Sequence, residues 1–305
     1  MSPPPDRRPS SGPVARVGRG PLEMGRERSG PPERKSLAVR SATITVMIRA
    51  CFAAAKSLKR DFGEVEQLQV SEKGPGDFVS RADIMAERTL RKELERTRPE
   101  YGFLGEEGGE VKGANGGDGH NRWIADPLDG TTNFLHGVPH FAISLALERD
   151  GEIIAAVIYQ PISDELFWAE KGNGAFIDTP NARSRRLRVS GRKELTRGLI
   201  ATGIPFIGKG DHPAYLRKLE AVMGKTAGVR RWGAAALDLA FVAAGRYDAF
   251  FEYGLASWDV AAGLLIVKEA GGLISDTKGQ PYLLGGPSIL ASNVGLRDPM
   301  IDILA

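Results

Sequence analysis

Residues 123–134 read WIADPLDGTTNF and join a short apolar run to a group of carboxylates, glycine and hydroxyls. The apolar residues lead into Asp126 and Asp129, which stand three positions apart. Pro127 lies between them, removes one backbone donor and favours an extended conformation at Asp126. The pattern predicts a strand that ends at the Asp-Pro pair, turns sharply and starts a helix, with Asp129 as the helix cap.

The same stretch combines ligands for a cation with donors for an anion. Two carboxylates supply hard oxygen atoms of the kind that Mg²⁺ prefers. Gly130 lets the backbone approach a ligand closely, and the N–H groups at a helix start suit phosphate. A structural interpretation remains open, in which Asp129 only caps the helix and Asp126 only occupies the turn. Short motifs often mislead, so this stretch alone favours neither interpretation.

The composition is that of a soluble globular protein with a large core. The 305 residues are 42% hydrophobic, enough for one large domain or two closely packed subdomains. The single cysteine, Cys51, excludes an intrachain disulfide framework and fits a reducing compartment. Its place in a helical pattern predicts a buried apolar side chain. No uncharged apolar run approaches membrane-spanning length, so we expect a cytoplasmic protein.

The net charge of +3 comes from the N-terminal tail. Residues 1–40 hold nine basic and four acidic residues, a net charge of +5, so the remaining residues sum to −2. That body lacks the excess of positive charge that a nucleic-acid surface needs. Residues 1–36 are rich in Pro, Gly, Ser and Arg and are predicted to be disordered. A polybasic nucleic-acid tail and a dispensable extension are both open interpretations of this segment.

Hydrophobic periodicity predicts two helices and a series of strands in the first half of the chain. Helices are expected over residues 37–62 and about 81–97, with a short strand at 66–71 and a loop at 73–76 between them. The glycine-rich segment 108–119 lacks the Lys-Ser/Thr ending of a phosphate loop and is predicted to be an exposed loop. After the central motif, an antiparallel meander is predicted with strands at 141–148, 152–160, 165–169 and 174–177.

From about Arg186 the pattern changes to short strands that alternate with helices. The strands are predicted at 199–204, 249–251, 273–275 and 289–291, and the helices at 213–223, 234–244, 258–270 and 295–304. A meander followed by such an α/β half predicts a layered mixed architecture. We expect an N-terminal α+β subdomain over residues 37–185 and a C-terminal α/β subdomain over residues 186–305.

Carboxylates recur where the predicted elements begin or end. A single Asp in such a place, such as Asp259 at the start of an apolar helix, is usually a cap. Four groups, each beside a glycine or a turn, favour a shared polar site, because carboxylates near apolar elements need a cation or a donor. The groups are Asp77 with Asp83, Glu106 with Glu107, Asp126 with Asp129, and Asp259.

Neither the histidines nor the serines form a competing site. His136 and His140 are four residues apart, but Gly137 and Pro139 prevent them from sharing a helical face as a zinc pair would. No serine stands in a glycine-flanked elbow, which argues against an acyl-transfer hydrolase.

Four motifs, in this order, resemble those of the inositol monophosphatase family of Mg²⁺-dependent, lithium-sensitive phosphatases. They are GDFVSRAD (76–83), FLGEE (103–107), WIADPLDGTTNF (123–134) and SWDVAAG (257–263). The resemblance covers residues 37–305 and departs from the family at Ser80, where threonine is usual. It implies an α-β-α-β-α sandwich of the inositol monophosphatase and fructose-bisphosphatase type, and a homodimer.

The resemblance also implies which residues hold the metal ions, two to three Mg²⁺ per site. One Mg²⁺ would be held by Glu106, Asp126 and the backbone carbonyl of Leu128. A second would be held by Asp126, Asp129 and Asp259, and a third, weaker ion would share Glu106.

Further roles are implied for the residues around the metal ions. Thr131, oriented by Asp83, would position the attacking water together with Glu106. The N–H groups of Gly130 and Thr131 would bind phosphate, while Lys73 and Asp77 would lie near the metals. The polyol would meet Ala235, Glu252 and Asp259.

The expected reaction is hydrolysis of myo-inositol monophosphate by metal-activated water, because cations neutralise the phosphate dianion that otherwise repels hydroxide. Relatives with the same metal motifs act on fructose 1,6-bisphosphate, histidinol phosphate or phosphoadenosine phosphate, and some bacterial relatives bind the transcription machinery. Glu252 favours inositol phosphate, because a carboxylate can accept hydrogen bonds from vicinal hydroxyls. The structural alternative for Glu252 is an exposed charge at a strand end.

Overall fold

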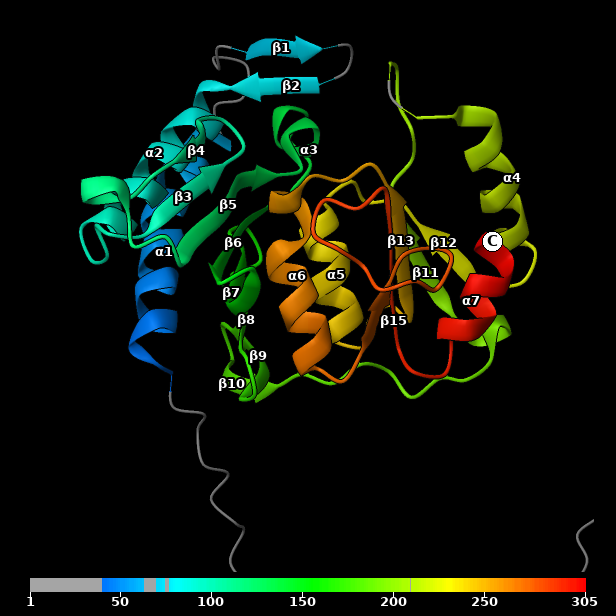
Figure 1. Ribbon diagram of the computed structural model, residues 1–305. Helices are drawn as coiled ribbons and strands as arrows, with labels where there is room; N and C mark the ends of the chain where they lie inside the picture. Colours follow the sequence, from blue (N-terminus) through cyan, green and yellow to red (C-terminus); the bar gives the residue numbers. More distant parts are fainter. Residues whose placement is uncertain (1–39, 63–69, 75–76, 209) are drawn as a thin grey trace, which may run out of the picture. The chain divides into compact units, whose positions relative to one another are not determined.

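The structure is a computed structural model that describes residues 40–62, 70–74, 77–208 and 210–305 (Figure 1). The predicted disordered tail, the start of the first helix at residues 37–39 and most of the strand at 66–71 lie outside the described residues. Residues 70–74 and 77–80 form a hairpin of β1 (Val70–Gly74) and β2 (Asp77–Ser80). The prediction of a loop at 73–76 was therefore wrong for Lys73 and Gly74, which complete β1.

Two helices form the first layer. The apolar stripe of α1 (Ala42–Phe62) packs against α2 (Arg81–Glu95) and buries Cys51 completely, as predicted. Ser80 caps α2 by accepting a hydrogen bond from the backbone N–H of Ala82, and Asp83 accepts one from the N–H of Ser80 at 2.9 Å. This reciprocal capping box fixes the point at which the chain passes from β2 into α2.

An eight-stranded sheet forms the second layer, in the order β10-β9-β8-β7-β6-β5-β3-β4. Its strands are β3 (Gly102–Gly105), β4 (Gly109–Val111), β5 (Asn121–Asp129), β6 (Ala142–Arg149), β7 (Glu152–Gln160), β8 (Glu165–Glu170), β9 (Gly174–Thr179) and β10 (Ala182–Arg186). The predicted meander is confirmed from β6 to β9. The loop predicted at 108–119 was partly wrong, since β4 and the 3₁₀ turn η2 (Ala114–Gly116) form within it. No sequence pattern marked the polar edge strand β10.

Two apolar helices form the middle layer, and a second sheet follows them (Figure 1). The helices α5 (Ala235–Ala243) and α6 (Ser257–Glu269) bury most of their side chains, because both sheets cover them. The second sheet has the order β12-β11-β13-β15-β14. Its strands are β11 (Leu199–Thr202), β12 (Gly228–Arg230), β13 (Ala249–Tyr253), β14 (Leu273–Ser275) and β15 (Ser288–Ser292).

The fifth layer consists of α4 (His212–Met223) and α7 (Arg297–Leu304), which pack on the outer face of the second sheet around Tyr215, Phe251 and Met300. The predicted α-β-α-β-α layering is confirmed. The short elements α3 (Thr131–Leu135) and η3 (Leu195–Arg197) complete the described chain, and the division at residue 186 into two subdomains stays a prediction. None of the helices in the described ranges combines the length and apolar character that a membrane span requires.

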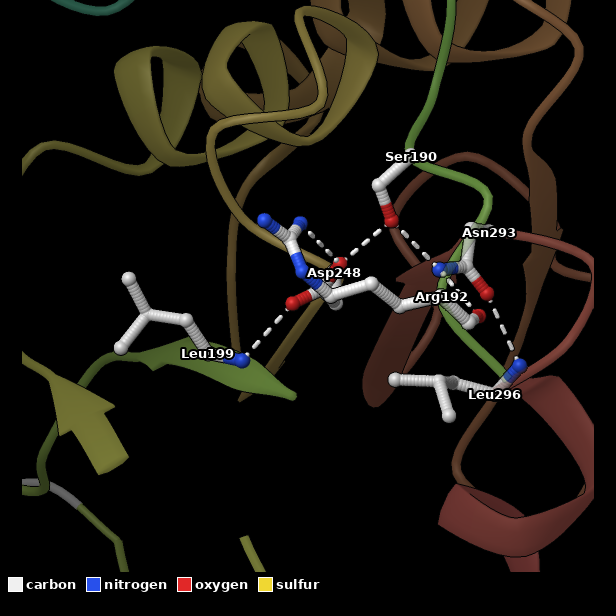
Figure 2. Close-up of polar contacts among 6 residues, drawn as sticks. All are labelled: Ser190, Arg192, Leu199, Asp248, Asn293 and Leu296. Atoms are coloured by element: carbon white, nitrogen blue, oxygen red, sulfur yellow. Dashed lines mark hydrogen bonds and ion pairs between the residues drawn. The ribbon is translucent and has the colours of Figure 1, made fainter. Parts of the chain in front are cut away.

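A buried polar cluster fixes one end of the second sheet (Figure 2). The fully buried Asp248 accepts hydrogen bonds from the backbone N–H of Leu199 at 2.8 Å, from Arg192 Nη1 at 3.0 Å and from the Ser190 hydroxyl. Asn293 donates to Ser190 Oγ at 2.7 Å and so ties the end of β15 to the same cluster. Leu199 begins β11 and Asp248 directly precedes β13, so the cluster fixes the alignment of these two parallel strands at the end where both begin.

Candidate active site

A cavity of about 1070 Å³ lies at the ends of β5 and β13 and at the starts of α3, α5 and α6. Its wall contains all the residues predicted to hold metal ions, which are Glu106, Asp126, Leu128, Asp129 and Asp259. The predicted substrate-binding residues Gly130, Thr131, Ala235 and Glu252 line the same cavity. The fold therefore gathers segments from both halves of the sequence around one polar space.

Asp126 and Asp129 reach the same space because β5 contains a bulge. Side chains three positions apart on a regular strand point to opposite faces of the sheet. Here Asp126 pairs with Ser144 and Asp129 with Ala142, so β5 holds one more residue than β6 over this interval. The extra residue turns both carboxylates toward the cavity, and Pro127 is tolerated because it stands in the bulge.

The prediction that Asp129 caps the following helix was wrong. β5 continues through Asp129, and Gly130 is the residue before α3, with φ of 94° in the left-handed region. The Asp129 carboxylate instead accepts hydrogen bonds from the N–H groups of Ala235 at 3.2 Å and Ala236 at 2.8 Å. It thus caps α5, a helix about a hundred residues further along the chain, whose own preceding residue Ala234 offers no side-chain cap.

Glu106 stands beside Asp126 because β3 and β5 are parallel neighbours whose carboxyl ends meet at one edge. The turn that follows Glu106 is held by Glu87 of α2, which accepts from the N–H groups of Glu107 at 2.8 Å and Gly108 at 2.7 Å. A side chain at Gly105 would place its Cβ 2.3 Å from Glu87 Oε2 and would displace the carboxylate that holds this turn. Sequence reasoning missed Glu87, since its partners lie twenty residues away.

Thr131 and Asp83 are in direct contact. Thr131 Oγ1 lies 3.0 Å from Asp83 Oδ1 and 3.1 Å from the carbonyl oxygen of Leu128. Asp83 is buried, and burial raises its pKa, although hydrogen bonds from Ser80 and Thr131 oppose this shift. Asp83 therefore connects the cap of α2 to the first residue of α3.

The carboxylates in the cavity wall repel one another. Burial raises the pKa of Asp126 well above its usual range, and the neighbouring charges of Glu106, Asp129 and Asp259 raise it further. Burial and then Asp259 raise the pKa of Asp129 in the same way. A cation would relieve this repulsion, and carboxylates with one backbone carbonyl form a donor set that fits Mg²⁺. Within the described ranges, no three His, Cys, Asp or Glu side chains already converge as a closed metal cage.

Asp259 fulfils both interpretations that the sequence allowed. One carboxylate oxygen accepts a hydrogen bond from the N–H of Ala256 at 2.7 Å, which caps the start of α6. The same side chain lines the cavity. Helix capping and a place in the polar site are therefore compatible at this residue.

Glu252 at the end of β13 is not the exposed strand-end charge of the structural alternative. Its side chain is partly buried and lies over Gly203, where an added Cβ would sit 1.9 Å from Glu252 Oε1. Burial and the nearby Asp259 raise the pKa of Glu252 to about 8, and the positive charge of Arg231 opposes this rise. Arg231 lines the cavity and had no sequence motif to mark it.

Lys73 and Asp77 lie on the hairpin, in β1 and β2 respectively. The structure describes their backbone only, so their supporting role near the metals stays a prediction.

Comparison with known proteins identifies what this chain is similar to. Residues 40–302 match the inositol monophosphatase family. An inositol-1-monophosphatase of Rhizobium meliloti is 56% identical over 265 residues, which cover 87% of this chain and 97% of that protein. A protein named Nus factor SuhB, from Pseudomonas aeruginosa, is 45% identical over 82% of this chain and 91% of its own length. The crystal structure of the extragenic suppressor protein suhB of Bartonella henselae superposes with a TM-score of 0.82 at 50% identity, over 87% of this chain and 98% of that one.

Proposed function

Because the chain belongs to the inositol monophosphatase family, a metal-dependent family, we propose that it hydrolyses myo-inositol monophosphate to inositol and phosphate with Mg²⁺. The observation that carries this proposal is the cavity whose wall combines mutually repelling carboxylates with Glu252 and the start of α5. The 56% identity to an inositol-1-monophosphatase supports the same substrate.

The carboxylate wall, formed by the side chains of Glu106, Asp126, Asp129 and Asp259, would hold two to three Mg²⁺ ions. Glu106, Asp126 and the Leu128 carbonyl would bind one ion, and Asp126, Asp129 and Asp259 a second. When bound, Mg²⁺ neutralises the phosphate and lowers the pKa of a coordinated water. Asp126 and Asp129 suit metal binding, because the bulge and Pro127 hold both side chains on one side of the sheet within a hydrogen-bonded strand.

The protein itself would orient the water and the phosphate. The Thr131 hydroxyl donates its single hydrogen toward Asp83, which leaves its lone pairs free to accept a hydrogen bond from water. Glu106 would share that water. The N–H groups at the start of α3 lack intrahelical acceptors and would bind the phosphate oxygens. No covalent phosphoryl-enzyme is needed in this scheme.

Phosphate release from a panel of esters, with Mg²⁺, tests the proposal. The panel consists of inositol 1-phosphate, histidinol phosphate, fructose 1,6-bisphosphate and phosphoadenosine phosphate, each with and without lithium. We expect preference for inositol 1-phosphate by about tenfold in kcat/KM, which corresponds to one good polar contact with the polyol, and inhibition by lithium. Preference for another ester would still support metal-dependent hydrolysis but would contradict inositol monophosphate as the substrate.

Glu252→Gln is expected to weaken selection for the polyol. Bound Mg²⁺ would oppose the rise in the pKa of Glu252 and favour the carboxylate. The amide keeps the size of the side chain but replaces one acceptor by a donor and removes this charge. We expect kcat/KM for inositol 1-phosphate to fall about tenfold or more, since hydrogen bonds to charged groups contribute about 1.5–3 kcal/mol. The rate with 4-nitrophenyl phosphate, which carries no hydroxyls, should change by less than threefold. An equal loss with both esters would assign Glu252 to the metal site instead.

A second candidate function is binding to the transcription machinery. The name Nus factor SuhB occurs among relatives at 45% identity and below, a greater distance than that of the relative named as an inositol-1-monophosphatase. Retention of the whole carboxylate wall supports hydrolysis. Absence of phosphate release from every ester in the panel would favour the binding function. The homodimer stays a prediction.

A further inference from the structure

We propose that Asn133 is a positioning residue that fixes the wall at Gly233–Ala235 relative to the start of α3. The inference rests on the proposed function, in which the start of α3 meets the phosphate and the start of α5 meets the polyol. Asn133 stands in the third position of α3 and lines the cavity, yet it is neither a metal ligand nor a general base in the proposed reaction.

The Asn133 amide joins α3 to a segment seven residues further along the chain and to another about a hundred residues further along. Its Nδ2 atom donates to the carbonyl oxygen of Trp232 at 2.7 Å and to that of His140 at 2.8 Å, and lies 3.4 Å from the carbonyl oxygen of Gly233. Trp232 and Gly233 lead directly into α5. One amide group thereby connects α3 to the segment before β6 and to the segment before α5.

The same segments touch at Gly130, which gives independent support. A Cβ added at Gly130 would lie 3.0 Å from the carbonyl oxygen of His140 and 3.4 Å from that of Gly233. The rings of His140 and Trp232 also pack together, with centroids 5.1 Å apart. Backbone approach, ring packing and the Asn133 amide therefore hold the same two segments against the start of α3.

Asp129 adds the last connection. Its carboxylate accepts from the N–H groups of Ala235 and Ala236, so it restrains the first turn of α5 from the metal side of the cavity. Asp129 and Asn133 flank Gly130–Thr132, the segment proposed to bind phosphate. If both restraints are needed, loss of the Asn133 amide will let the wall at Gly233–Ala235 move while the metal and phosphate sites stay in place.

Asn133→Asp and Asn133→Ala test this role. Asn133→Asp keeps the shape of the side chain but removes both N–H donors and places charge beside carbonyl oxygens, so it should have the larger effect. For Asn133→Asp we expect KM for inositol 1-phosphate to rise about tenfold, while kcat changes less than threefold. KM for 4-nitrophenyl phosphate and the inhibition constant of inorganic phosphate should both remain within threefold of wild type. Amide hydrogen exchange should accelerate in a peptide that covers residues 232–236.

Asn293→Ala is the matched control. The Asn293 amide also bridges separate segments, through Ser190 Oγ and the Arg192 carbonyl, but it lies outside the cavity wall (Figure 2). The Asn293→Ala variant should have a lower melting temperature, but the ratio of its KM for inositol 1-phosphate to its KM for 4-nitrophenyl phosphate should equal that of wild type. Unchanged exchange at 232–236, or an unchanged KM ratio, in Asn133→Asp overturns the positioning role. Wild-type protein that is inactive on inositol 1-phosphate overturns the proposed function instead, and the exchange experiment then decides alone whether Asn133 fixes this segment.

Discussion

Asp126→Asn is expected to lower kcat for inositol 1-phosphate roughly a thousandfold, at the upper end of the effect of removing one electrostatic stabiliser from an active site. Asp126 is the carboxylate that both proposed Mg²⁺ ions would share, and it lies in the bulge of β5, close enough to Glu106 and Asp129 for their charges to raise its pKa. The amide has the same size but no charge. The variant should retain the wild-type circular dichroism spectrum, and wild-type protein treated with EDTA should show a comparable loss that added Mg²⁺ reverses.

The same substitution should not destabilise the metal-free protein. Burial and like-charged neighbours raise the pKa of Asp126, so the folded state retains a proton at pH values where the unfolded state has lost it. Stability of the metal-free wild type therefore declines as the pH rises above the unfolded value of about 3.9. The amide of the variant cannot ionise, so its melting temperatures measured in EDTA between pH 5 and 8 should depend less on pH than those of wild type. Full activity, or a melting temperature far below wild type at pH 7, would contradict the role proposed for Asp126.

The order of predicted strands and helices indicated a layered mixed architecture, whereas the five layers and most of the residues that gather in the cavity were implied by the resemblance to the inositol monophosphatase family. Alternation and turn residues were sufficient for the meander, because each hairpin is decided by its own strands and loop. The course of β5 was not predictable in this way. Whether the chain stops at the Asp-Pro pair or continues through a bulge depends on pairing with β6, and the partner that Asp129 caps lies in α5.

The roles of residues that contact distant elements could not be predicted from the sequence, for the same reason. Glu87 holds the turn after Glu106, and Asn133 holds the segment before α5. Arg231 supplies positive charge beside Glu252. Each of these side chains has its partners in a different element, so no local spacing marks them. Asn133 belongs to the motif at residues 123–134, and only the contacts of its amide distinguish it from a solvated helix residue.

Asp248→Ala is expected to lower the free energy of unfolding by about 2–4 kcal/mol, the range for removing the acceptor of buried donors that then lack a partner. The backbone N–H of Leu199 and the Ser190 hydroxyl would lose their acceptor, while the half-exposed Arg192 can turn to water, which limits the loss. A domain of this size should melt about 10 °C lower. Thermal denaturation with Mg²⁺ present measures this change.

Asp248→Asn is the control, because it keeps one carbonyl oxygen for these donors and should lose about half as much stability. Both variants should hydrolyse inositol 1-phosphate at near wild-type rates below their melting temperatures, since Asp248 lies outside the cavity wall. Unchanged stability would contradict the assignment of the cluster as the anchor of β11 and β13. Asp126 and Asp248 are buried almost equally, at 2% and 0% exposure, yet only removal of the Asp248 carboxylate is expected to lower stability. The neighbours decide the difference: Asp126 faces other carboxylates that need a cation, whereas Asp248 faces N–H and O–H donors that already satisfy it.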